Sequence, residues 1–167
     1  MGFFVRKVSR VRWPDGENDK FRSAGELSAD AITCDLKTES NEFSWWKIDN
    51  LDALETMAIS IASVFDTEAS IFVVAVPEEK IMELHLNVDN TPQHGITAIS
   101  ELRKCHYDIG KLNVNRLLDI AKLVATSIQE KRVLWISKKT ILDKLKKLKE
   151  DGEVDSSCLG KAYSRLR

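Results

Sequence analysis

Cysteine and long apolar runs are both scarce in this sequence. The three cysteines, Cys34, Cys105 and Cys158, are an odd number at wide separations, which fits reduced thiols and excludes a disulfide framework. No stretch of about 18 apolar residues is present, so the sequence predicts no membrane span. The apolar run near Met1 is too short for a signal peptide. We therefore expect a cytoplasmic protein with no membrane partner.

Net charge is nearly absent as well, because 25 Lys and Arg face 26 Asp and Glu, which gives −1. This balance excludes a whole-molecule polyelectrolyte such as a generic nucleic-acid coat. The charges are nevertheless uneven: residues 1–14 carry +4, residues 15–83 carry −11 and residues 103–149 carry +9. The pattern indicates either an interaction surface for nucleic acid or an acidic partner, or a fold whose acidic and basic parts neutralise each other.

What is present is the composition of a soluble globular protein. Of the 167 residues, 43% are hydrophobic and 31% are charged, which is enough to form a core without disulfide or metal staples. There is no repeat and no linker long enough to require two folding units. We therefore expect a single domain over 1–167, within which 113–167 could form a helical subdomain.

The N-terminal half contains most of the strand patterns. Residues 3–13 alternate loosely until Pro14, and 30–48 alternates on both sides of a polar turn, which predicts a β-hairpin. Residues 71–76 are uninterrupted apolar residues, typical of a strand covered on both faces. Residues 80–88 alternate again, which favours a strand over a helix beginning at Pro77.

Helical spacing occurs at 50–65 and dominates after residue 97, with helices expected at 98–105, from Asn113 onward, from Ser137 to about 150, and at 156–166. A short apolar run at 133–136 separates two of them. Strands followed by helices indicate an α+β fold: an antiparallel-dominated sheet of about four to five strands from the N-terminal half, one inserted helix and a helical C-terminal third.

Three aromatic residues in the predicted hairpin are candidates for partner binding: Phe43, Trp45 and Trp46. Trp45 and Trp46 are consecutive, so on a strand they point to opposite faces. If no helix covers the outer face of the hairpin, Phe43 and Trp45 form an exposed aromatic pair of the kind enriched at interfaces. The alternative is a sheet covered on both faces, in which these residues belong to the core.

The second candidate surface is the basic helix that follows Ser137. Its lysines would be the nucleic-acid contacts: Lys138, Lys139, Lys144, Lys146, Lys147 and Lys149. Residues 137–154 resemble the recognition helix and wing entry of winged-helix proteins, a family in which such a helix enters the major groove and lysines hold phosphates. The preceding 129–136 reads instead as a loop and a β-like run. The alternative is a surface helix with docked leucines and solvated lysines.

Catalytic and metal motifs are weak. The histidines and Cys105 lack the paired spacing of zinc ligands, and the glycines lack the spacing of a phosphate loop, so we expect no metal and no cofactor. No catalytic residue is assigned from spacing. An enzymatic site could still assemble from dispersed residues such as His85, Asp89, His94 and His106.

These observations favour a cytosolic, non-enzymatic interaction protein that binds a protein partner through the aromatic hairpin and oppositely charged surfaces. An accessory, antitoxin-like or immunity-like role is compatible with its size. The first alternative is a nucleic-acid-binding regulator with a winged-helix-like C-terminal segment, and the second is an enzyme.

Overall fold

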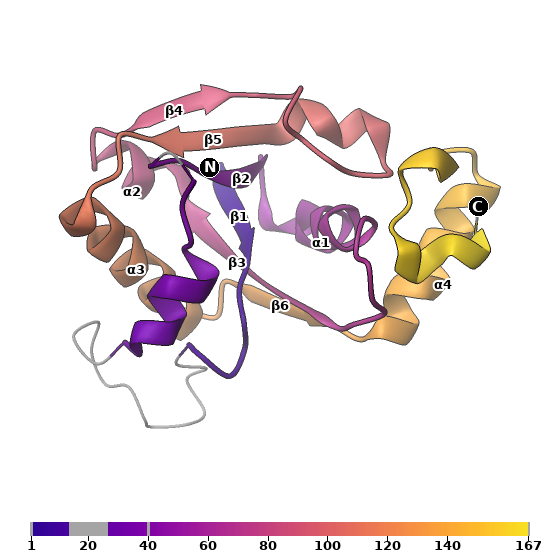
Figure 1. The fold of residues 1–167 in the computed structure, drawn as a ribbon, viewed down its shortest axis with the longest axis horizontal. Helices are drawn as coiled ribbons and strands as arrows, with labels where there is room; N and C mark the ends of the chain where they lie inside the picture. The colour runs from indigo at the N-terminus through magenta and orange to yellow at the C-terminus, as the bar shows by residue number, and fades with distance from the viewer. Residues whose placement is uncertain (1, 14–26, 40, 167) are drawn as a thin grey trace.

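The computed structural model describes residues 2–13, 27–39 and 41–166 and contains one antiparallel sheet (Figure 1). Its strands are β1 (Phe3–Lys7), β2 (Phe43–Ile48), β3 (Ile71–Pro77), β4 (Asn87–Asn90), β5 (His106–Gly110) and β6 (Val133–Ile136). They are ordered β4-β5-β2-β1-β3-β6, and every neighbouring pair is antiparallel. The predicted α+β class is confirmed, with six strands rather than four to five, because β5 and β6 come from the second half of the chain.

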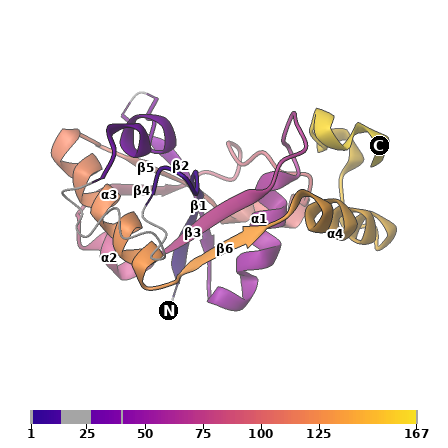
Figure 2. The same ribbon diagram turned by 90° about the horizontal axis from the view of Figure 1, so that it is seen from below.

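Helices cover both faces of the sheet. The α-helices are α1 (Leu54–Ala62), α2 (Glu78–Met82), α3 (Val114–Gln129) and α4 (Lys138–Glu150). Residues Ala31–Asp35 form a π-helical turn. The 3₁₀ segments are Leu51–Ala53, Ser100–Cys105, Ser156–Cys158 and Lys161–Leu166. In Figures 1 and 2, α3 lies beside one end of the central strands, and α4 with the C-terminal segment lies at the other end of the molecule.

The alternation of side chains along the central strands divides the core into two layers. Phe3 and Val5 of β1 pack with α1, α4 and the C-terminal segment. Phe4 packs on the opposite face with α3, Ala31 and Leu36. Strand β3 is buried along its whole length, which explains its unbroken apolar sequence.

Local signals define the best-predicted elements. Asn113 and Ser137 are the N-caps of α3 and α4, since each side chain accepts a hydrogen bond from the backbone N–H three residues later. Helix α4 ends before Gly152, whose φ of +79° is in the left-handed region that favours glycine. Both helices and the apolar strand β3 were predicted from the sequence pattern, whereas residues 133–136, which form β6, were expected only as a short apolar, β-like run.

The predicted hairpin over 30–48 is wrong in its first arm. Residues Ala31–Asp35 form a π-helical turn, held by the Asp35 carboxylate, which accepts hydrogen bonds from Ser9 and Trp13 far upstream in the sequence. A tight turn follows, in which Glu39 and Glu42 exchange backbone hydrogen bonds before β2 begins. The alternation of apolar and polar residues in this arm does not lead to a strand, because tertiary contacts decide the local structure here.

Three further boundaries differ from expectation. Strand β1 ends at Lys7, and its predicted stop at Pro14 lies outside the described residues. Residues 80–88 are divided between α2 and β4, so the helical alternative holds for α2, where Glu78 and Glu79 provide the acidic first turn. Strand β5 occupies 106–110, where the sequence predicted only the end of a helix.

Candidate partner-binding surface

The three aromatic candidates lie in the core. Phe43, Trp45 and Trp46 are 5%, 0% and 8% exposed. Phe43 and Trp45 pack together at a centroid separation of 5.7 Å on the face that carries Ala31 and Leu36, while Trp46 faces the other layer. The expected exposed pair therefore does not form, because the π-helical turn and α3 cover that face. The structure has the alternative arrangement, a sheet covered on both sides.

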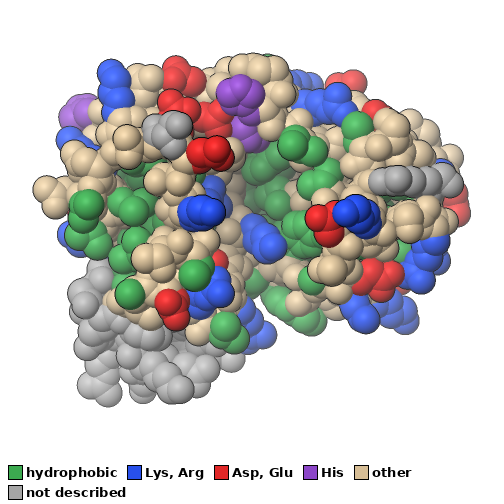
Figure 3. Space-filling view, viewed as in Figure 1, with side chains coloured by type: hydrophobic (Ala, Val, Ile, Leu, Met, Phe, Trp, Pro, Cys, Tyr) green, Lys and Arg blue, Asp and Glu red, His purple; other side chains and the backbone are tan. Residues whose placement is uncertain are grey.

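The lysines of α4 are on the surface. The helix buries Ile141 and Leu145 in the core layer that also contains α1 and the C-terminal segment, and it turns its other side to solvent. The exposed lysines are Lys138, Lys139, Lys144, Lys146 and Lys147, and Lys149 is half-buried. Figure 3 shows Lys and Arg side chains gathered at the end of the molecule where α4 lies.

Few of these charges are neutralised. Lys144 Nζ lies 2.9 Å from Glu55 Oε2 of α1, and Lys149 Nζ donates to the backbone carbonyl of Leu166. Within the described part of the chain, the other four exposed lysines of α4 have no ion-pair partner. The helix therefore presents a net positive surface, in which Asp143 and Glu150 are the interspersed acids.

The surroundings of α4 differ from those of a winged helix. The element before it is β6, a strand of the main sheet, rather than a short helix. The segment after Gly152 leads to the 3₁₀ turn Ser156–Cys158, and no strand is formed there among the described residues. The resemblance over residues 137–154 thus reflects an amphipathic, lysine-rich helix with a glycine after its end, as the alternative held.

Strand β6 is the edge of the sheet beside α4. It pairs with β3 on one side, and no described strand pairs with its other side. Its four residues carry no charge and no proline, the usual devices that protect an edge. Trp135 is 51% exposed on this strand. The sequence showed 133–136 as an apolar run but gave no sign that it lies at an edge, because strand order depends on contacts distant in the sequence.

Two of the dispersed candidates for catalysis come together at β5. His94 Nδ1 lies 2.6 Å from Asp108 Oδ2, and Ser44 Oγ donates to Asp108 Oδ1 at 3.0 Å. His106 Nδ1 lies 2.9 Å from Thr91 Oγ1. These bonds connect the segment before β5 to β5 and β2.

The other two candidates are elsewhere or differently engaged. His85 is exposed in the turn between α2 and β4, at a φ of +52°. Asp89 is the register partner of Asp108, but its carboxylate accepts a hydrogen bond from Asn87 at 2.8 Å. The four residues therefore do not form one site.

The hydrogen bonds around Asp108 hold segments of the fold together and are not arranged for catalysis. The carboxylate of Asp108 lies between the serine and the histidine, so Ser44 donates to an acid and has no base to activate it, unlike a hydrolase triad. Burial raises the pKa of Asp108, but hydrogen bonds from His94, Thr91 and Ser44 outweigh it and hold the pKa below its ordinary value. Burial likewise lowers the pKa of His106.

The depressed pKa of Asp108 predicts a pH-dependent contribution to stability. Because the unfolded chain binds the proton more tightly, the contribution is fully present above the unfolded pKa of about 4 and is lost as pH falls through the folded value. Asp108→Asn should therefore lower the free energy of unfolding by roughly 1 kcal/mol at pH 7, with a gap to the wild type that narrows below pH ~4. Urea unfolding of both proteins at several pH values measures this difference in the free energy of unfolding.

The matched control for this measurement is Asp89→Asn, which changes the exposed cross-strand neighbour of Asp108. Its effect should stay within about 0.5 kcal/mol at every pH. A gap between Asp108→Asn and wild type that is the same at pH 7 and pH ~3 would contradict the assignment of the pH dependence to this carboxylate.

Among residues 2–13, 27–39 and 41–166, no group of three or more His, Cys, Asp or Glu side chains is placed to hold a metal ion. No helix in the described segments combines the length and the apolar character that crossing a membrane requires.

The exposed candidate surface therefore consists of the β6 edge with Trp135 and of the lysine face of α4 beside it. Comparison of the chain with protein-family models, with curated proteins and with solved structures found no match in any of the three.

Proposed function

We propose that this chain is a cytosolic, non-enzymatic interaction protein that binds an acidic, extended segment of a protein partner along the β6 edge and the lysine face of α4. The observation that carries the proposal is an uncharged edge strand, with one side that no described strand pairs with, next to lysines that form no ion pair with the described residues. An accessory, antitoxin-like or immunity-like role remains the class of biological role that fits such a binder.

Strand addition suits this edge. An extended peptide that pairs with β6 would use its own backbone N–H and C=O groups for affinity, and side chains along it would supply specificity. Trp135 provides an exposed aromatic anchor, a residue type enriched among the strongest contacts of interfaces. Backbone pairing of this kind favours a protein over a nucleic acid as the occupant.

Charge determines which peptide fits. Lys131 precedes the strand, and Lys138 and Lys139 lie two and three residues after its end. If two copies of β6 paired antiparallel, Lys131 of one copy would approach the Lys138 end of the other, and like charges would repel. An acidic segment would instead meet complementary charge at both ends, so we propose this occupant rather than a second copy.

The test replaces three residues together, Trp135→Ser, Lys138→Glu and Lys139→Glu, and compares the partner recovered from native cells by cross-linking with that of the wild type. Affinity for the purified partner should fall by about tenfold or more, because an aromatic anchor is lost and two charges are reversed. The control is Lys37→Glu with Lys111→Glu, two exposed lysines without ion pairs in the described structure. Lys111 follows β5, which is separated from β6 by three strands.

The exposed lysines also favour the nucleic-acid alternative, and the same variants decide between them. Fluorescence anisotropy with single-stranded and duplex DNA at about 50 mM and 200 mM salt tests it, since phosphate contacts weaken steeply with salt. DNA binding that the triple variant abolishes, together with a partner interaction that it leaves unchanged, would overturn the protein-binding proposal.

A further inference from the structure

The two central strands of the sheet separate at one end. Pairing between β1 and β2 ends at Val5 and Trp46, whereas β1 continues to pair with β3 as far as Lys7. Strand β2 likewise continues to pair with β5 as far as Phe43. A crevice therefore opens between the last residues of β1 and the first residues of β2, while both strands remain fixed from outside.

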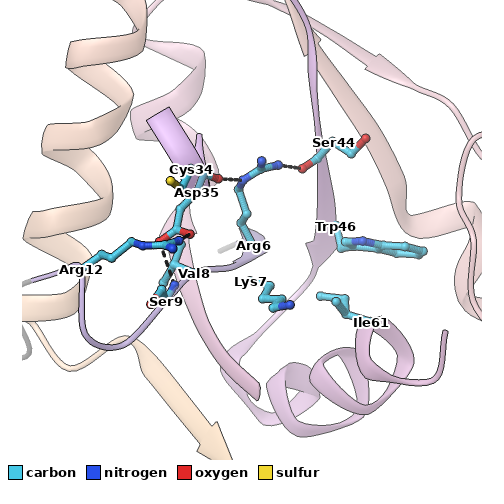
Figure 4. A pocket seen from close by; sticks show the side chains of 10 residues that line it. All are labelled: Arg6, Lys7, Val8, Ser9, Arg12, Cys34, Asp35, Ser44, Trp46 and Ile61. Carbon is cyan, nitrogen blue, oxygen red and sulfur yellow. Dashed lines mark hydrogen bonds and ion pairs between the residues drawn. The ribbon is translucent and has the colours of Figure 1, made fainter. Parts of the chain in front are cut away.

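This opening is a cavity of about 470 Å³, within the range of small-molecule sites. Because it passes between two strands, residues from both faces of the sheet line it: Arg6, Arg12 and Asp35 from one side, and Lys7, Trp46 and Ile61 from the other. Figure 4 shows the Arg6 guanidinium near its middle, with Trp46 and Ile61 forming an apolar wall opposite Asp35.

The acid in the crevice is already satisfied. The Asp35 carboxylate accepts hydrogen bonds from the Ser9 backbone at 2.8 Å, from Trp13 Nε1 at 2.8 Å and from Arg12 Nη1 at 3.0 Å. It thereby neutralises Arg12. On the neighbouring strand β5, outside the crevice lining, both oxygens of Asp108 are occupied by Ser44 and His94.

The two other cations in the crevice, Arg6 and Lys7, form no ion pair with an acid among the described residues, although the nearby Asp35 carboxylate acts on Arg6 and raises its pKa against the effect of burial. Arg6 donates through Nε to the backbone carbonyl of Asp35 at 2.9 Å and through Nη1 to that of Ser44. Its guanidinium lies 4.6 Å from the centroid of the Phe43 ring. Burial lowers the pKa of Arg6 to about 10, so it stays charged at neutral pH. Nη2 has no partner in the described structure, and Lys7 Nζ lies 4.3 Å from the centroid of the Phe65 ring.

From this arrangement we infer that the crevice binds a small molecule carrying a phosphate monoester. Two cations that form no ion pair among the described residues match a dianion, and a guanidinium held rigidly by backbone carbonyls presents its remaining donor without further ordering. Trp46 and Ile61 offer apolar contact to the rest of the ligand. The inference does not depend on the proposed partner surface, because the crevice lies between β1 and β2 and that surface lies at β6 and α4.

Cys34 supplies a direct readout, since it lines the crevice and its side chain is exposed. The wild-type chain is labelled with iodoacetamide, and mass spectrometry measures the labelling rate at each cysteine. Adenosine monophosphate is the probe, adenosine is its unphosphorylated match, and inorganic phosphate is the third ligand. At about ten times its Kd, adenosine monophosphate should slow labelling of Cys34 about tenfold, while Cys158 is unaffected.

Two variants connect the protection to the cations. Lys7→Gln removes an exposed charge without disturbing the core and should weaken binding of adenosine monophosphate by roughly tenfold, as expected for a charged hydrogen bond. Lys37→Gln, an exposed lysine outside the crevice lining, should leave it unchanged. Arg6→Gln should abolish protection, and a circular dichroism spectrum establishes whether this variant folds.

Three results would overturn the inference. They are no protection of Cys34 by adenosine monophosphate or phosphate up to roughly 10 mM, equal protection by adenosine, and protection that Lys7→Gln leaves at wild-type strength. None of these would bear on partner binding at β6, which is measured with different variants.

Discussion

Replacement of Trp45 by alanine is expected to lower the free energy of unfolding by about 3–5 kcal/mol. The side chain is fully buried at the centre of the layer formed with Phe4 and Phe43, at ring centroid separations of 6.5 and 5.7 Å. Truncation removes one of the two tryptophan side chains of that layer, and the cavity can collapse only partly because β2 is paired on both sides. Urea unfolding followed by circular dichroism measures the loss.

The chain offers a close control for this experiment in Trp135→Ala, the same chemical change at a residue that is 51% exposed on the β6 edge. We expect a change in stability within about 0.5 kcal/mol for that variant. Partner binding should distinguish the two tryptophans in the opposite way. We expect Trp135→Ala to weaken the affinity for the partner. Weakened binding with unchanged stability in Trp45→Ala would contradict its assignment to the core and restore the aromatic hairpin as an interface.

The elements predicted correctly from the sequence are those whose signals are local. In α3 and α4 the apolar stripe, the capping residue and the end of the helix all lie within one segment, from Asn113 and from Ser137 onward. Strand β3 is similar, because burial on both faces imposes an apolar residue at every position. Such elements can be predicted from the local sequence without knowledge of any contact between residues distant in the sequence.

The elements that were missed depend on distant contacts. Strand β5 carries His106 and Asp108 toward one layer, and these polar residues are accommodated because Ser44, Thr91 and His94 reach them from elsewhere. Residues 106–109 of β5 do alternate between polar and apolar, since Tyr107 and Ile109 face the layer opposite to that of His106 and Asp108. The alternation covers only four residues and directly follows the helical spacing at 98–105, so the sequence predicted only the end of a helix there.

Among the candidate surfaces, too, the one with a local sequence signal could be predicted and those that depend on distant contacts could not. Exposure of the α4 lysines followed from helical spacing around Ile141 and Leu145. The β6 edge and the crevice could not be predicted, because one depends on strand order and the other on the separation of β1 from β2. Arg6 and Ser44, which meet across the crevice, are 38 residues apart in the sequence.

The uneven charge distribution can now be interpreted in space. Acidic and basic regions do meet, as in the Lys144–Glu55 and Arg165–Glu68 pairs. These contacts leave most of the α4 lysines unpaired among the described residues, so mutual neutralisation is only partial. A net charge near zero therefore coexists with a distinctly basic surface, which is the property that the proposed binding of an acidic segment requires.

Replacement of Asp35 by alanine is the other change with a large expected effect, about 2–4 kcal/mol of lost stability. The carboxylate is only 10% exposed and holds the Ser9 backbone, Arg12 and Trp13 against the π-helical turn. Without it, the Trp13 indole N–H is left buried with no acceptor and Arg12 loses its counter-charge. The end of β1 loses the contacts that fix it to the turn.

Asp35→Asn separates charge from shape, because it retains the size and one acceptor of the side chain but removes the charge opposite Arg12. About half of the alanine effect is expected for it. Asp66→Ala, at an exposed acid, should cost less than about 0.5 kcal/mol in the same urea titration. If Asp35→Ala were as mild as Asp66→Ala, the carboxylate would not be what holds the π-helical turn against the end of β1.

Because Arg6 donates to the backbone carbonyl of Asp35, a folded Asp35→Asn should retain protection of Cys34 by adenosine monophosphate, since the carbonyl is unchanged.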